Sequence, residues 1–324
     1  MLSLKEIQAP VASHLGTFEE KFRTSMKSRV PLLDTIMHYI VKRKGKQMRP
    51  LFVFLAASVT GGITDSTHRA ATLIELLHTA TLVHDDVVDD SNLRRGFFSI
   101  NALWKNKISV LVGDFLLSKG LLFSLENDDY NLLNIVSNAV KEMIEGELLQ
   151  IEKARRLDIE EEIYFEIIRK KTASLIASCC ACGSASSGSS PETIEKMRLF
   201  GEYTGIAFQI KDDLFDYEAG NSTGKPAAID IKDQKMTLPL IYLLNHSGFM
   251  EKRWIVNTVK NHNTETSRVT TLIEKVRESG GILYAHEKML EYRQKAIELL
   301  HTFPESVYRD SLEQLVIFTT ERNK

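Results

Sequence analysis

One acidic pattern occurs twice in this chain, at Asp85 to Asp89 and at Asp212 to Asp216, and each copy follows a long apolar stretch with helical spacing. At 3.6 residues per turn, the first and last aspartates of each copy lie one above the other on a helix face. Two such helices facing each other would gather at least four carboxylates in one cleft. Like charges about 4 Å apart repel by roughly 4 kcal/mol at an effective dielectric near 20. The pattern therefore predicts two helices that converge around cations.

The ligand type indicates which cation. Carboxylate oxygens favour Mg²⁺, which keeps several waters and usually bridges to substrate phosphates. The alternative is two unrelated, solvated helix faces, because acidic runs are common on protein surfaces. Two copies, each set against apolar residues and accompanied by basic motifs, favour the metal site.

Helical periodicity extends over almost the whole chain. Apolar residues advance by threes and fours in 68–90 and again in 199–214, as a buried helix face requires. Strand-like alternation with hairpin turns is absent, so the predicted fold class is all-α. No linker-like break appears, and the Gly/Ser stretch 183–191 is interpreted as a surface loop with Pro191 starting the next helix. We expect one domain over 1–324, built from roughly ten or more helices.

Composition excludes several other classes. The 41 basic and 43 acidic side chains give a net charge of −2, which provides no general attraction to nucleic acid or anionic lipid. The longest unbroken apolar run, Leu51 to Ala57, is far shorter than the ~20 residues of a membrane span, and the N-terminus lacks the shape of a signal peptide. We therefore expect a soluble cytoplasmic protein. Its cysteines are interpreted as small buried helix residues, because a disulfide framework or metal site would need other spacing; they are Cys179, Cys180 and Cys182.

Basic residues stand near both acidic copies, at turns and predicted helix starts. Guanidinium groups on a turn suit bidentate phosphate binding, and free backbone N–H groups at a helix start also bind anions. Each of these residues alone usually solvates a surface, but beside two acidic walls they suit a cleft that holds two diphosphates. They are Lys46 and Arg49 upstream, Arg94 and Arg95 after the first copy, Lys170 and Lys171 before Thr172, and Lys225 and Lys235 after the second copy.

These residues resemble the trans-isoprenyl (polyprenyl) diphosphate synthase family. The stretch from His78 through the first acidic copy to Gly96 looks like that family's first aspartate-rich motif, and the stretch from Gly205 through the second copy is similar to its second. The resemblance extends from Gly45 to about residue 244. It implies an all-α isoprenoid synthase bundle around a central cavity, usually a homodimer. Two positions depart from the family pattern. A single glycine, Gly45, precedes Lys46 where the family often has two, and Gln234 precedes Lys235 where the family commonly has glycine. Both lysines are retained.

The resemblance also implies an activity and a role for each motif residue. The enzyme would condense isopentenyl diphosphate with an allylic diphosphate, using about three Mg²⁺ ions. The implied metal ligands are Asp85, Asp89, Asp212 and Asp216. The implied substrate-binding residues are Lys46, Arg49, His78, Arg94, Arg95, Lys225 and Lys235. Positive charge would stabilise the departing diphosphate, and oxygen dipoles would stabilise the allylic cation. The residues implied in catalysis are Asp86, Lys171, Thr172, Gln209 and Asp213.

Product length is the least determined property. Ala80 and Thr81 precede Asp85 by five and four residues, about one helical turn below the metal ligands. In the family, bulky residues there stop growth at short products, so two small residues predict a cavity that continues toward 111–123. We expect a long, octaprenyl-like all-trans product. Two alternatives stay open: these residues pack against a neighbouring helix, or the product is a shorter farnesyl or geranylgeranyl chain.

Three other functions are weaker alternatives. His84 next to Asp85 is typical of a metal-dependent phosphohydrolase, but the chain lacks further histidines at the spacing that such a metal site requires. A terpene cyclase shares the fold but holds one diphosphate and would not need the upstream basic pair. A non-catalytic subunit of a heteromeric synthase would be expected to lose motif aspartates, and all six are present.

Overall fold

The protein is a bundle of helices, as the all-α prediction requires. The computed structural model describes residues 2–42, 45–94, 96–156, 160–218 and 229–322. Its first half contains α1 (Leu4–Gln8), the 3₁₀ turn η1 (Ala9–Val11), α2 (Ala12–Ser25), α3 (Pro31–Lys42), α4 (Met48–Thr60), α5 (Asp65–Val88), α6 (Ile100–Leu125) and α7 (Tyr130–Arg156). Its second half contains α8 (Glu161–Ile168), the π-helical turn η2 (Arg169–Ala173), α9 (Ser174–Ser186), α10 (Pro191–Glu218), α11 (Ile229–Lys232), α12 (Leu238–His246), α13 (Phe249–Asn261), α14 (Thr266–Glu278), α15 (Gly281–Leu300) and α16 (Val307–Glu321).

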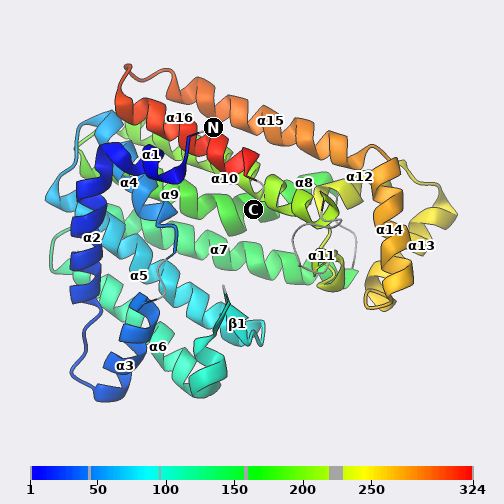
Figure 1. Cartoon of the computed structure of the whole chain (residues 1–324), viewed down its shortest axis with the longest axis horizontal. Coiled ribbons are helices and arrows are strands. Elements are labelled where there is room, and N and C mark those ends of the chain that lie inside the picture. The colour runs from blue at the N-terminus through cyan, green and yellow to red at the C-terminus, as the bar shows by residue number, and fades with distance from the viewer. Residues whose placement is uncertain (1, 43–44, 95, 157–159, 219–228, 323–324) are drawn as a thin grey trace.

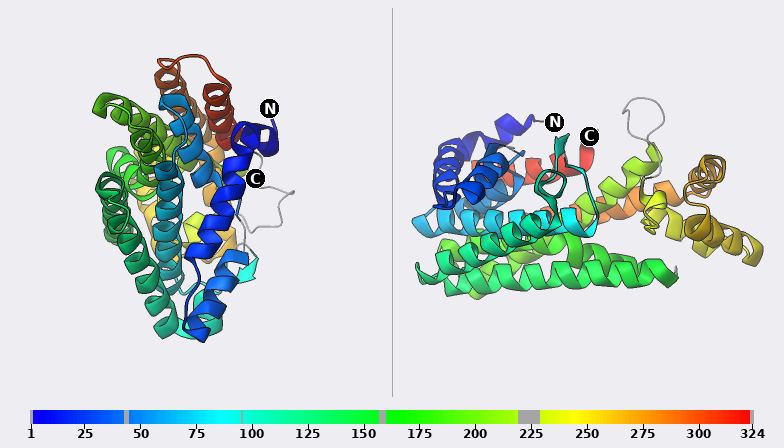
Figure 2. Two further views of the ribbon diagram at one scale, coloured as in Figure 1. Left: turned by 90° about the vertical axis from the view of Figure 1, so that its left-hand side faces the viewer. Right: turned by 90° about the horizontal axis from the view of Figure 1, so that it is seen from below.

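The long helices run along the long axis of the molecule (Figure 1). α5 packs against α4 and α6, while α10 packs against α9 and α15, and α4 contacts α9 between them. Helices α13 and α14 lie at one end and α2 and α3 at the other (Figure 2). This arrangement places the two acidic copies on two central helices, α5 and α10.

Local signals in the sequence set the ends of these helices. The Thr64 hydroxyl accepts a hydrogen bond from the Thr67 backbone N–H, and the Thr67 hydroxyl accepts one from Thr64 in return, so α5 starts with a capping box. α10 starts at Pro191, as predicted from the Gly/Ser stretch. Gly183 allows α9 to approach α4 closely, since a Cβ there would lie 2.4 Å from the Val53 carbonyl oxygen. Burial of the three cysteines on α9 agrees with the role expected from the sequence.

A small β-hairpin interrupts the helices directly after the first acidic copy. β1 (Leu93–Arg94) pairs antiparallel with β2 (Phe97–Phe98), and Gly96 takes a positive φ of 80° at the turn. The expectation that hairpins are absent is therefore wrong here. Strands of two residues are too short to show an alternation of apolar and polar residues. Gly96, at the turn, was the only residue in the sequence that indicated a hairpin.

Helix α6 is long and apolar enough by length and composition to cross a membrane, and one third of its most apolar stretch is buried. A single helix of this kind is weak evidence for a span, because core helices of soluble proteins share these properties. The buried part of its apolar surface packs on α5.

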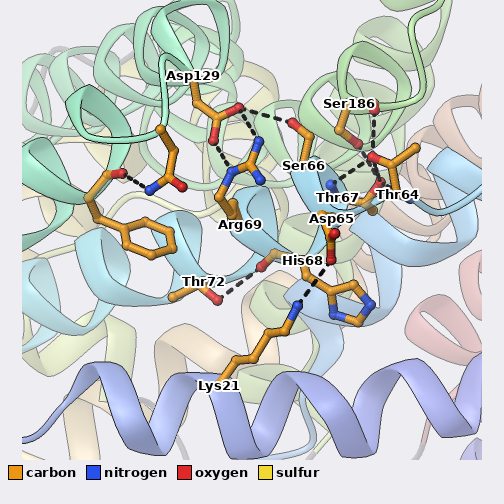
Figure 3. Close-up of polar contacts among 12 residues, drawn as sticks. Lys21, Thr64, Asp65, Ser66, Thr67, His68, Arg69, Thr72, Asp129 and Ser186 are labelled. Atoms are coloured by element: carbon orange, nitrogen blue, oxygen red, sulfur yellow. Dashed lines mark hydrogen bonds and ion pairs between the residues drawn. The ribbon is translucent and has the colours of Figure 1, made fainter.

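His68 is a buried titratable residue near the start of α5 (Figure 3). Its ring lies 4.9 Å from the Phe54 ring between centroids, and its Nε2 is 3.2 Å from His14 Nδ1. Burial, with smaller contributions from Lys21 and His14, lowers the pKa of His68 to about 4. The folded protein therefore holds this ring neutral at pH values where the unfolded chain protonates it.

We predict that His68 makes the fold sensitive to acid. Between pH 6.5 and about pH 4 the unfolded state binds a proton that the folded state excludes, so the free energy of unfolding falls as pH falls. The loss should be about 1–3 kcal/mol, reduced by hydration of the partly accessible ring edge. Urea unfolding at pH 7.5 and pH 5 should show a smaller pH effect in His68→Gln than in wild type. Exposed His38 is the control, and an equal pH effect in wild type and His68→Gln would contradict the assignment.

Candidate active site

The first acidic copy lies at the C-terminal end of α5. Asp89 caps this helix, with its N–H donating to the Asp85 carbonyl at 2.8 Å. Asp89 is exposed and Asp85 is half-buried, so both carboxylates reach the same open end of the helix. Asp86 is only 3% exposed and instead lines an internal cavity of about 240 Å³. The pattern thus divides into an outer pair and one inward carboxylate, as its helical spacing predicts.

The second copy lies near the C-terminal end of α10. The Asp212 carboxylate forms an ion pair with Arg322, the residue that follows α16. The Asp216 carboxylate accepts a hydrogen bond from the backbone N–H of Asp230 at 2.7 Å, which attaches the start of α11 to α10. Asp213 is buried. The three aspartates therefore have different environments although they lie within one turn and a half.

Asp213 belongs to a chain of side-chain hydrogen bonds. Tyr164 donates to its Oδ2 at 2.7 Å, Gln209 donates to its Oδ1 at 2.9 Å, and Thr172 donates to Gln209 at 2.8 Å. Burial, followed by repulsion from Asp230, raises the pKa of the Asp213 carboxyl to about 7. Burial also raises the pKa of the Tyr164 phenol well above its ordinary range. This network holds Thr172 and Gln209 beside the second acidic copy.

Lys171 and Thr172 lie in the π-helical turn η2, which joins α8 to α9 without a break. The prediction that a helix starts here is wrong, so free N–H groups of a helix start are not available for phosphate. A π turn inside a longer helix shifts the side chains that follow it, and such turns are frequent at functional sites. Lys171 pairs with Glu147 and donates to Gln150 at 3.2 Å.

A second cavity, of about 160 Å³, adjoins this turn. Lys171, Asp213 and Lys235 line it together with Asp230. Lys235 lies 3.4 Å from the Asp230 carboxylate and 3.1 Å from that of Asp233. Two of the lysines expected at the diphosphates, Lys171 and Lys235, therefore line one cavity and are paired with carboxylates.

The cavity beside Asp86 contains the other basic group. Arg49 forms an ion pair with Glu75 at 3.3 Å, and both side chains line this cavity. The Lys46 ammonium lies 5.9 Å from the centre of the Phe318 ring of α16, and the Lys46 carbonyl accepts from Gln8. His78 is half-buried on α5. These residues differ in their immediate contacts, and of Arg49, Lys46 and His78 only Arg49 lines this cavity.

The two residues expected to control product length have different surroundings. Ala80 is fully buried in a cluster with Leu76, Val112 and Leu116, on the interface of α5 and α6. Thr81 is half-buried, and its hydroxyl donates to the His78 carbonyl at 2.8 Å. Ala80 lines neither of the two cavities beside the aspartates, so a growing chain there would have to displace core side chains.

Three expected phosphate-binding residues cannot be placed. Arg95 and Lys225 lie outside the described residues, as does most of the loop that carries Lys225, and only the backbone of Arg94 is described, in β1.

Several polar residues at the site were not expected from the sequence. Arg322 is 110 positions from Asp212, and its guanidinium lies 4.4 Å from the centre of the Phe208 ring and 5.5 Å from that of Phe215. Tyr164 stands 49 positions from Asp213. No spacing pattern connects residues so distant in sequence, so only the fold reveals these partners.

The acidic residues form a donor set of oxygens alone. Among the described residues, no three histidine, cysteine or acidic side chains come close enough together to hold a metal ion by themselves. This arrangement fits Mg²⁺, which typically takes one or two protein carboxylates and completes its shell with water and substrate phosphates. The outer pair Asp85 and Asp89 and the exposed edge of Asp212 are suited to that kind of shared coordination.

Comparisons with known proteins agree with this fold and donor set. Residues 30–276 match the family model for polyprenyl synthetase. The chain is 36% identical over 321 residues to an all-trans-nonaprenyl-diphosphate synthase (geranyl-diphosphate specific) of Rhodobacter capsulatus, covering 98% of both chains. It is 33% identical to the octaprenyl diphosphate synthase of Escherichia coli over the full length of both.

A solved structure supports the same conclusion. A polyprenyl synthase of Caulobacter crescentus, crystallised with calcium and isoprenyl diphosphate, superposes with a TM-score of 0.90 at 31% identity, covering 99% of this chain and 98% of that one. The fold and acidic motifs define a trans-prenyltransferase of the isoprenoid synthase type. This chain belongs to the polyprenyl synthetase family.

Proposed function

We propose that this enzyme extends an allylic diphosphate with isopentenyl diphosphate, in an Mg²⁺-dependent reaction, to a long all-trans polyprenyl diphosphate of octaprenyl type. The observation that carries the proposal is the pair of acidic motifs at the ends of α5 and α10, within a chain that aligns over its full length with long-chain synthases. The small residues at positions 80 and 81 also favour a long product. The reaction would take place in the cytoplasm.

In the mechanism, Asp85, Asp89, Asp212 and Asp216 would hold Mg²⁺, which when bound would supply positive charge to stabilise the departing diphosphate. Lys171 and Lys235 face the same cavity and can add charge-assisted hydrogen bonds to that group. The Gln209 amide nitrogen donates to Asp213 and the Gln209 Oε1 accepts from Thr172, so two side-chain oxygens lie next to this contact, where their dipoles can stabilise the allylic cation. Attack by the isopentenyl double bond forms the new carbon–carbon bond, and the proton released passes to diphosphate.

Isopentenyl diphosphate would bind on the other side of α5. Arg49 lines the cavity beside Asp86, and its ion pair with Glu75 keeps the guanidinium in place before substrate arrives. Lys46, His78 and Arg95 would complete this phosphate site, while Arg94 and Lys225 would join Lys171 at the allylic diphosphate.

Replacing Asp85 by alanine should lower turnover by at least about 10²–10³, the effect of losing one preorganised electrostatic group. The fold should persist, because an accessible carboxylate at a helix end stabilises little. Incorporation of radiolabelled isopentenyl diphosphate at saturating Mg²⁺ measures the effect, with exposed Glu287→Ala as control. Near-wild-type incorporation by Asp85→Ala would falsify the metal assignment. A wild-type enzyme that ionises the primer but incorporates no label would indicate a cyclase.

Arg49→Ala should weaken isopentenyl diphosphate more than the allylic primer, because only the former is bound without metal. A lost charge-assisted hydrogen bond contributes roughly 1.5–3 kcal/mol, about ten- to a hundredfold in affinity. Steady-state kinetics with each substrate varied separately give the two effects, and exposed Arg253→Ala controls for charge alone. Equal weakening of both substrates would refute this division of the basic residues.

Ala80→Phe should shift the products to shorter chains. A phenyl group at this buried position would obstruct the contact between α5 and α6 that a growing chain would have to open, and overpacking should also destabilise the core by about 1–3 kcal/mol. Reversed-phase chromatography of the dephosphorylated products measures chain length, and Thr81→Phe tests the same path from a half-buried position. A wild-type product of fifteen or twenty carbons would contradict the long-chain proposal, and unchanged products in both variants would exclude these positions as length determinants.

We also propose that the enzyme is a homodimer through the outer face of α6 and α7. These two helices expose several large apolar side chains, including Leu111 at 56% and Leu148 at 61%. Monomeric proteins rarely expose apolar patches of this kind without a partner. Two antiparallel copies of the same face would bury them in a symmetric contact.

Introducing charge on this face should separate the subunits. Leu111→Glu together with Leu148→Glu should shift the sedimentation coefficient to that of a monomer, because unpaired carboxylates would be buried at the contact. Leu283→Glu, a change at an exposed leucine of α15, should leave the dimer intact. A monomeric wild-type protein at micromolar concentration would refute this contact.

A further inference from the structure

A large groove lies near the N-terminal end of α5, on the side of α5 that faces away from α9. Residues of α2, α5 and α6 line it, and its volume is about 1040 Å³, larger than either cavity beside the aspartates. We call it the α2–α6 groove. It contains five basic and three acidic side chains, in a protein of net charge −2.

Two of the five cations are neutralised within the groove. Lys21 lies 3.3 Å from the Asp65 carboxylate, and Arg69 Nη2 lies 3.1 Å from that of Asp129 (Figure 3). The remaining cations have no carboxylate partner among the described residues; they are Lys27, Arg29 and Lys119. The two other acidic groups facing the groove are Glu20 and Glu126.

Lys119 is the most informative of the three unpaired cations. Its ammonium donates to the Lys27 carbonyl at 3.0 Å and lies 5.2 Å from the centre of the Phe115 ring. Burial lowers the pKa of Lys119, since desolvation is not compensated by a negative charge. An anion bound at this position would recover the lost solvation.

Apolar side chains continue the groove beyond these cations. Phe115, Leu122 and Phe123 line it, and Leu122 is 56% exposed. Apolar surface in contact with water costs roughly 25 cal/mol per Å², so a hydrocarbon chain lying on these residues would be favoured. The groove therefore combines an anion-binding end with an apolar wall.

The groove is separate from the catalytic centre. Thr72, which lines it, precedes Asp85 by thirteen residues, about 20 Å along α5 at 1.5 Å per residue. Between the two, α5 and α6 pack tightly, and a Cβ on Gly120 would lie 3.0 Å from Leu77. The groove opens to the surface and not into the core.

We propose that the α2–α6 groove binds an amphiphile consisting of a phosphate-type headgroup on a hydrocarbon chain. The headgroup would lie among Lys27, Arg29 and Lys119, and the chain would follow Phe115 and Leu122. A free phosphate would leave the apolar wall uncovered, and a neutral chain would leave the ammonium of Lys119 unpaired. Anionic phospholipids and polyprenyl diphosphates share this chemistry, so the proposal stands whether or not the proposed reaction is correct.

Dodecyl phosphate is a suitable probe. Calorimetric titration of the full-length protein in EDTA, which prevents metal-dependent diphosphate binding, should show saturable binding below the micelle concentration. Lys119→Gln should weaken it about ten- to a hundredfold through loss of a charge-assisted contact, and Lys119→Arg should retain most of the affinity. Leu122→Ser should weaken it about three- to tenfold. Lys141→Gln, at an exposed lysine of α7, and Leu283→Ser should leave it unchanged.

Several results would overturn the proposal. These are no binding by wild type, equal binding of dodecyl maltoside, or an unchanged dissociation constant in both Lys119→Gln and Leu122→Ser. Circular dichroism verifies that these variants are folded, and prenyl transfer by Lys119→Gln should remain at the wild-type level. Competition then identifies the source: displacement of the probe by farnesyl diphosphate indicates an isoprenoid ligand, and displacement by phosphatidylglycerol vesicles but not phosphatidylcholine vesicles indicates a lipid. Displacement by neither would reject the amphiphile.

Discussion

The structure depends on carboxylates that lie at the C-terminal ends of two helices, where the helix dipole disfavours negative charge. The carbonyl end of a helix carries a partial negative charge, so each carboxylate there costs about 0.3–1 kcal/mol before any mutual repulsion. Asp85 and Asp89 stand at this end of α5, and Asp212 and Asp216 stand near this end of α10. Such a local conflict is expected where function requires it, because the same field that penalises carboxylates attracts a divalent cation.

Neighbouring elements offset this cost at the second copy. Arg322 neutralises Asp212, the N–H of Asp230 bonds to Asp216, and Tyr164 and Gln209 donate to buried Asp213. These contacts bring α8, α11 and the end of α16 onto one turn of α10. The acidic motif therefore organises the surrounding bundle as well as the chemistry.

The sequence predicted the helical class, the helices that carry the aspartates and the family, because these follow from periodicity and from two motifs with fixed spacing. It could not predict the partners of those aspartates. Lys171 was expected at a helix start, but continuous hydrogen bonding from α8 through η2 to α9 removes that start. The hairpin at Arg94 and the ion pair of Arg322 depend on contacts between distant or very short segments, which no local pattern encodes.

Helix α6 shows how one apolar helix can serve several purposes. Val112 and Leu116 are buried in the core against α5, Leu111 and Leu125 are exposed, and the Lys119 ammonium donates to the Lys27 carbonyl just beyond α2. Mean hydropathy alone makes this helix look able to cross a membrane, because the average includes the side chains on all sides of the helix. Its apolar residues belong to the core, to the proposed subunit contact and to one wall of the α2–α6 groove, and Lys119 is the residue that carries the proposed anion binding there. Around the helix, Lys119 points about 20° from Val112 and Leu122 about 20° from Leu111, so a substitution in the groove should be checked for effects on the neighbouring core and outer face.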